Sequence, residues 1–135
     1  MDKISFFNEH KYMFITSNLL IIPSLTGYFL NYKKLVYMNT FGLIISSKFW
    51  YTGNNDIYRK IDLIYQPINA ITFLLYGNLY SKNIYTLTIG NILFLKGLYF
   101  FNKSHIEYHK KNRFWFTNHV SFHLCMITAN IMAYF

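Results

Sequence analysis

Two histidines stand one helical turn apart near the end of the chain, His119 and His123 in the segment NHVSFH. Residues four positions apart on an α-helix share one face and lie about 6 Å apart along the axis. Imidazole nitrogens are common zinc ligands, so the pair is a candidate for binding one metal ion. Two histidines packed between helices are an equally weighted interpretation, because this spacing also recurs by chance.

A second pair with the same spacing, His105 and His109, lies in a polar stretch before the last apolar segment. Two such pairs invite comparison with membrane di-iron hydroxylases and desaturases, but those enzymes need more histidines than the five in this chain. We therefore expect His105 and His109 to lie in a solvated loop, with a smaller chance that one of them reaches the metal. The single cysteine, Cys125, excludes a disulfide framework and a cysteine-based zinc site.

Two further ionisable residues, Asp62 and Lys96, fall in or at the edge of apolar segments, where a charge costs free energy. Asp62 could be a carboxylate in the first turn of a helix that complements the helix dipole, or a general base or orienting group. For Lys96 we expect an ammonium group that reaches towards the membrane surface, and we assign it no catalytic role.

The composition predicts an all-α fold, a multispan transmembrane helical bundle of about five spans. Hydrophobic residues make up 53% of the chain, aromatic residues 21% and charged residues 13%, and the charges gather between apolar runs. We expect one integral membrane domain over residues 1–135, with no separate soluble domain and with the first span retained rather than cleaved. The expected spans are 12–30, 35–51, 61–79, 83–101 and 114–135.

The basic residues predict the orientation in the membrane. If all five spans cross, most lysines and arginines fall on the side of the N-terminus, and the other side holds Lys33, Lys34 and Lys82. By the positive-inside rule the N-terminus is cytosolic and the C-terminus is on the opposite side. The basic residues behind the net charge of +8 would then set the orientation and contact anionic lipid headgroups. We do not expect nucleic-acid binding.

Three segments together resemble the alkaline ceramidase branch of the CREST superfamily of membrane hydrolases, whose relatives include the progestin and adiponectin receptors. Residues 16–23, TSNLLIIP, resemble the family's first helix. Ser47, Tyr51 and Asp62 have the spacing of a family motif in which a histidine follows the serine by four and precedes the aspartate by eleven. The NHVSFH segment matches the motif that supplies two zinc ligands. Family members usually have seven spans, so this chain would lack two.

The resemblance implies a zinc site held by His119 and His123. Tyr51 stands where the family has its first zinc-binding histidine, and a catalytic zinc normally keeps three protein ligands. The third ligand would then be Tyr51 itself, Asp62, or one histidine of the earlier pair.

The activity implied by the resemblance is hydrolysis of a lipid amide of the ceramide type, which would enter from the bilayer. Zinc would lower the pKa of its bound water, Asp62 would orient or deprotonate that water, and Ser47 would donate a hydrogen bond to the oxyanion or hold the water. The alternative is a non-catalytic multispan membrane protein with the same helix plan, no metal and an interaction or structural role. Residue 51 separates the two interpretations, because an active hydrolase of this family should have a histidine there or a substitute for it.

Overall fold

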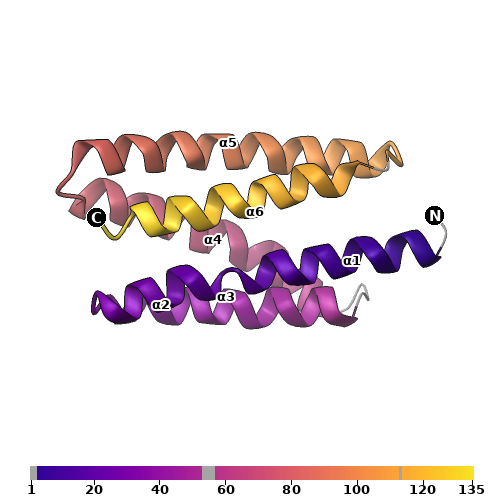
Figure 1. Cartoon of the computed structure of the whole chain (residues 1–135), viewed down its shortest axis with the longest axis horizontal. Helices are drawn as coiled ribbons and strands as arrows, with labels where there is room; N and C mark the ends of the chain where they lie inside the picture. Colours follow the sequence, from indigo (N-terminus) through magenta and orange to yellow (C-terminus); the bar gives the residue numbers. More distant parts are fainter. Residues whose placement is uncertain (1–2, 53–56, 113) are drawn as a thin grey trace.

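The computed structural model describes residues 3–52, 57–112 and 114–135, and these ranges form α-helices joined by short turns (Figure 1). No strand occurs within them, so the predicted all-α class is confirmed. The helices are α1 (Lys3–Asn18), α2 (Ile21–Phe29), α3 (Lys33–Thr52), α4 (Ile57–Tyr80), α5 (Ile84–His109) and α6 (Trp115–Met132).

The helices run roughly parallel to the long axis of the molecule. In Figure 1, α1 and α2 follow one another along one line, and α3, α4, α5 and α6 then alternate in direction. The two ends of the chain therefore lie at opposite ends of the molecule. The α5–α6 pair makes the most extensive contact, and α3 contacts α1, α2 and α4.

The expected loop before the last segment is wrong in one respect. Helix α5 does not end near residue 101 but continues to His109, so His105 and His109 lie on a helix and not in a loop. The helix begins with the Asn83 side chain, which accepts a hydrogen bond from the backbone N–H of Tyr85 at 2.9 Å. Residues 102–109 are too polar to belong to the apolar run that precedes them, but they continue the helix.

The first expected span contains a break between α1 and α2, at Leu19 and Leu20. Pro23 has no backbone N–H, so the carbonyl of Leu19 cannot receive the usual bond from a residue four positions later. Instead, Ile22 N–H donates to Leu19 at 3.0 Å and Leu20 N–H donates to Ser17 at 3.1 Å, which tightens the chain locally.

Helix α2 approaches the end of α6 very closely at Gly27. A Cβ atom at this position would lie 2.6 Å from the Tyr134 hydroxyl oxygen and 2.9 Å from Cγ2 of Val36. The Tyr134 hydroxyl in turn donates to the carbonyl of Pro23 at 2.9 Å. Glycine at position 27 therefore makes room for a tyrosine that ties α6 to the helix after the break.

The bundle exposes many apolar side chains, and its interior contains polar as well as apolar residues. Among the described side chains, 33 large hydrophobic residues are exposed, and they come from every helix. The buried set includes eight polar residues: Thr16, Ser17, Ser24, Asn39, Ser46, Asn69, Ser104 and Asn130. By length and composition, α5 is the one helix of the described chain that is long and apolar enough to cross a membrane.

Two apolar clusters occupy the ends of the bundle. Met13, Phe49, Trp50 and Trp115 form one of them, near the end where α3 stops and α6 begins. The other consists of Leu35, Phe73, Ala133 and Tyr134, near the opposite end. The buried polar residues of α3, α4 and α6 lie along the helices between these clusters, so the middle of the interior is its most polar part.

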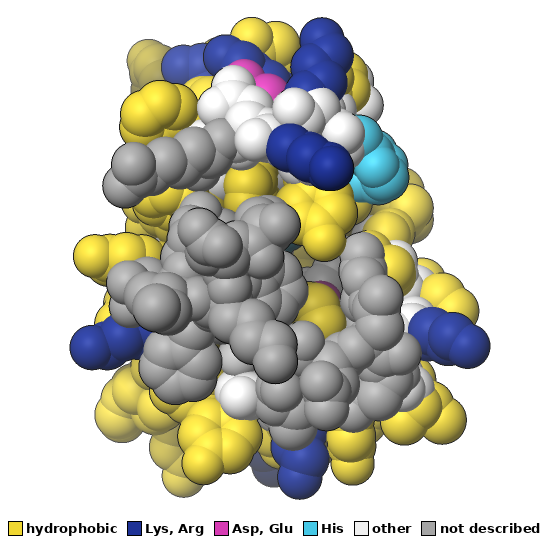
Figure 2. All heavy atoms as spheres, turned by 90° about the vertical axis from the view of Figure 1, so that its right-hand side faces the viewer, with side chains coloured by type: hydrophobic (Ala, Val, Ile, Leu, Met, Phe, Trp, Pro, Cys, Tyr) yellow, Lys and Arg dark blue, Asp and Glu magenta, His cyan; other side chains and the backbone are white. Residues whose placement is uncertain are grey.

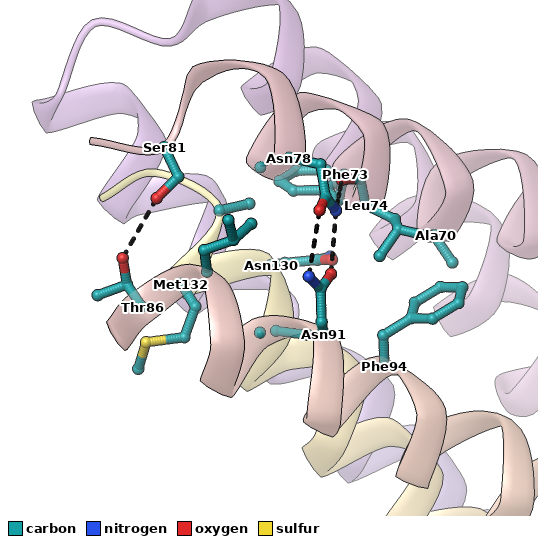
Figure 3. Close-up of a pocket in the computed structure, with 15 residues that line it drawn as sticks. Ala70, Phe73, Leu74, Asn78, Ser81, Thr86, Asn91, Phe94, Asn130 and Met132 are labelled. Atoms are coloured by element: carbon teal, nitrogen blue, oxygen red, sulfur yellow. Dashed lines mark hydrogen bonds between the residues drawn. The ribbon is translucent and has the colours of Figure 1, made fainter. Parts of the chain in front are cut away.

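A reciprocal amide pair joins α4 to α5 at the edge of the bundle (Figure 3). Asn78 Nδ2 donates to Asn91 Oδ1 at 3.0 Å, and Asn91 Nδ2 donates to Asn78 Oδ1 at 3.1 Å. Ser81 and Thr86 face each other near the connecting turn, with their hydroxyl oxygens 3.4 Å apart. These bonds hold α5 to α4, with which it shares far fewer contacts than with α6.

Candidate functional site

The histidines of α6, His119 and His123, lie side by side as their spacing predicts. Their ring centroids are 4.8 Å apart with an interplanar angle of 68°. The Nδ1 atom of His119 is 3.3 Å from the Ser104 hydroxyl on α5, and that of His123 is 3.0 Å from the Thr16 hydroxyl on α1. The two imidazoles therefore use the same ring atom to join α6 to two different neighbouring helices.

The hydrogen bonds of Thr16 indicate which nitrogen of His123 carries the proton. The Thr16 hydroxyl lies 3.0 Å from the carbonyl oxygen of Tyr12 and 3.1 Å from that of Met13, and it donates its one proton there. Thr16 is then the acceptor for an N–H on Nδ1 of His123. This arrangement leaves Nε2 of His123 with the lone pair.

His119 is enclosed mainly by aromatic rings. Trp50 and Trp115 contact it edge to face, with centroid distances of 5.6 and 6.2 Å. Phe101 and Phe122 lie 6.3 and 5.5 Å away. The imidazole of His119 thus sits in an apolar surrounding with Ser104 as its polar contact, which suits a neutral ring that joins helices.

Asp62 belongs to a compact polar cluster between α3 and α4. Its carboxylate accepts a short hydrogen bond from the Ser46 hydroxyl and a bond of 3.0 Å from Gln66 Nε2. Gln66 Nε2 also donates to the Ser46 oxygen at 2.6 Å. The serine that contacts Asp62 is therefore Ser46, whereas Ser47, the serine that the resemblance indicated, donates to Asn18 Oδ1 at 3.3 Å.

A small cavity of about 30 Å³ separates the Asp62 cluster from His123. Ser46 and Gln66 line it on one side, and His123 and Asn130 line it on the other. Asn69 also lines it, and the Oδ1 atom of that residue has no hydrogen-bond partner among the described residues. The cavity is large enough for one or two water molecules and far too small for a lipid chain.

Tyr51 lies on the outside of α3. Its side chain is 78% exposed, and its ring packs against Phe14 with a centroid distance of 5.9 Å. Trp50, the preceding residue, is the one that faces His119. A tyrosine with this orientation does not supply a ligand to His119 or His123.

A zinc ion with three protein ligands does not fit the donors that the structure brings together. Within the described ranges, no group of three or more histidine, cysteine, aspartate or glutamate side chains is arranged to hold a metal ion. His119 and His123 supply two donors, Tyr51 faces outward, and Asp62 is engaged by Ser46 and Gln66. We therefore derive no reaction step through zinc at this site.

The second pair, His105 and His109, has the opposite setting. Both side chains are exposed near the C-terminal end of α5, and their Nε2 atoms are 3.2 Å apart. At the top of Figure 2, which looks at this end of the molecule, basic side chains, a histidine and an acidic side chain gather on one rim. Lys96, also on α5, is exposed.

Sequence reasoning missed a buried asparagine network. Asn39 Oδ1 accepts from Asn69 Nδ2 at 3.3 Å and from Asn130 Nδ2 at 3.1 Å, which joins α3, α4 and α6. Asn39 Nδ2 also donates to the Tyr134 hydroxyl at 3.3 Å. The available signal was the presence of an asparagine inside each of three apolar segments, where an amide needs a partner.

Comparison with known proteins does not identify a family. No family model matches the chain, and no curated protein and no solved structure is significantly similar to it. The resemblance to the CREST hydrolases therefore rests on residues 16–23, on the spacing of Ser47, Tyr51 and Asp62, and on residues 118–123.

Proposed function

We propose that this chain is a multi-pass membrane protein with an interaction or structural role, held together by a polar interior and without a catalytic metal. One observation carries the proposal, which is the largely apolar surface of the bundle around a partly polar interior. Exposed apolar side chains surround it, and asparagine, serine and threonine side chains are buried inside it. Exposed apolar surface of this extent is costly in water and favourable against lipid.

The interhelical hydrogen bonds support the same proposal. Lipid provides little hydrophobic force between helices, so transmembrane bundles rely on close packing and on polar contacts. Asn39 with Asn69 and Asn130, Thr16 with His123, and Asn78 with Asn91 are contacts of this kind. Two of them, Thr16 with His123 and Asn39 with Asn130, join helices that are distant in sequence.

Cysteine labelling tests the membrane arrangement. In a Cys125→Ala background, a cysteine is placed either at Asn31, in the turn between α2 and α3, or at Lys111, in the turn between α5 and α6. With the N-terminus cytosolic, an impermeant maleimide added to intact cells should label the Asn31→Cys variant. It should label the Lys111→Cys variant only after the membrane is permeabilised.

Three results would contradict this proposal. Reversed labelling would contradict the orientation derived from the basic residues. Labelling at both turns in intact cells would contradict a multispan arrangement, as would release of the protein from membranes by alkaline carbonate.

A zinc-dependent lipid amide hydrolase is the second candidate function. One observation favours it: the cavity lined by His123 is also lined by Ser46 and Gln66, the two residues that hold Asp62. One histidine of the α6 pair and the two residues that bind Asp62 thus line the same small cavity. The missing third ligand places this candidate second.

Zinc content separates the two candidates. Elemental mass spectrometry of detergent-purified protein should find no zinc that depends on His119 or His123 if the first proposal is right. About one zinc per chain, lost in both His119→Ala and His123→Ala variants and retained in a His105→Ala variant, would favour the hydrolase and justify assays on lipid amides.

A further inference from the structure

The pair His105 and His109 carries an inference that goes beyond the proposed function. The two imidazoles project from successive turns of α5, and their centroids are 4.5 Å apart with an interplanar angle of 80°. Their Nε2 atoms are 3.2 Å apart. Both side chains are exposed, so a hydrated ion can reach them.

The separation of the two Nε2 atoms suits a chelate. Imidazole nitrogens bind transition metals at about 2.0–2.1 Å. At that bond length, two ligands at right angles lie about 3.0 Å apart, and two tetrahedral ligands lie about 3.4 Å apart. The observed 3.2 Å falls between these values, so the two nitrogens already have the separation that one shared ion requires.

We propose that His105 and His109 form a surface site for a divalent transition metal that prefers imidazole, of the Zn²⁺, Ni²⁺ or Cu²⁺ type. Without metal, one Nε2–H donates to the other Nε2. Binding needs both lone pairs, so that proton moves to Nδ1 of the same ring and the pair stays neutral. Water or a ligand from another molecule fills the remaining coordination positions.

The surroundings neither block the site nor complete it. His109 is the last residue of α5, where the helix dipole favours a cation. Glu107 accepts a hydrogen bond from Asn118 at 2.8 Å, and the Lys103 ammonium lies over the Tyr99 ring, 5.9 Å from its centroid. Lys110 and Lys111 are exposed beyond the helix end and oppose the dipole, so we expect binding weaker than that of a three-ligand site.

Nickel binding to the full chain tests the site. The protein is purified in detergent without a polyhistidine tag, stripped with a chelator and dialysed against Ni²⁺ alone, and nickel per chain is then measured by elemental mass spectrometry. We expect about one nickel in the original protein. We expect its loss in His105→Ala and in His109→Ala, and its retention in His119→Ala and His123→Ala.

A register control keeps the number of histidines constant. The double variant Ile106→His with His109→Ile keeps five histidines in the chain, but it places the two on α5 next to each other, on different faces of the helix. Ile106 is exposed, so the exchange should leave the fold intact, which circular dichroism checks. This variant should bind no nickel.

Two outcomes would overturn the proposal. One is the absence of bound nickel from the original protein. The other is retention of nickel in His105→Ala or His109→Ala. If His119→Ala or His123→Ala lost its nickel in that case, the α6 pair would be the metal site. Because zinc content and membrane labelling concern other residues, failure here leaves the proposed function untouched.

Discussion

The two histidine pairs have the same spacing and very different settings. On α6, His119 and His123 are held among other helices, and each uses Nδ1 to contact a hydroxyl of a different neighbour. On α5, His105 and His109 are exposed and contact each other through Nε2. A motif that reads identically in the sequence therefore produces a helix-joining pair in one place and a chelating geometry in the other.

The largest difference should appear when each pair is removed in full. Replacing both His119 and His123 by alanine deletes two packed rings and two interhelical hydrogen bonds, at a cost of about 2–4 kcal/mol in unfolding free energy. Replacing both His105 and His109 should leave that free energy nearly unchanged, since both side chains are exposed. Unfolding of both variants in the same detergent measures the contrast, and equal losses would show that the α6 pair is not structural.

A second contrast concerns the adjacent serines of α3. Ser46 is 3% exposed and bonds both Asp62 and Gln66, so Ser46→Ala should cost about 1–3 kcal/mol by leaving polar groups unpaired. Ser47→Ala removes a single bond of 3.3 Å to Asn18 and should cost less than about 1 kcal/mol. Unfolding measurements on the two variants test this order. The reverse order would show that Ser47, the serine that the resemblance indicated, makes the more stabilising contact.

The smallest effect isolates one hydrogen bond of the α6 pair. Thr16→Val removes the contact with His123 and should cost about 0.5–1.5 kcal/mol. Thr88→Val is the matched control, because Thr88 also donates to the carbonyl four residues earlier but is exposed. If the two variants unfold alike, the contact between Thr16 and His123 adds no stability.

Sequence reasoning predicted the helical class and the shared face of His119 and His123, because both follow from apolar run lengths and from helical spacing. It did not distinguish Ser46 from Ser47, since neighbouring positions differ by about 100° around the helix and both were serine. Ser47 and Tyr51, four positions apart, share a face, and that face turns away from His119. The rotation of α3 is set by contacts with α1 and α4, which no local pattern in α3 contains.

The asparagine network and the end of α5 were missed for a related reason. The hydrogen bonds that join Asn39 to Asn69 and Asn130 form only when α3, α4 and α6 pack together. Residues 102–109 read as a loop because polarity was taken as the end of a helix, whereas helices continue past an apolar run wherever the backbone bonds can be made. Tertiary packing determines the asparagine network, and local backbone hydrogen bonding determines where α5 ends.

The Asn39 network also has a consequence for the order of assembly. Asn39 emerges from the ribosome long before its partner Asn130, which lies 91 residues later, and Tyr134 lies 95 residues later. In the interval, its amide can pair only with Asn69, 30 residues later, or with water and headgroups. The hydrogen bonds of Asn39 between α3 and α4 are therefore incomplete until α6 is in place.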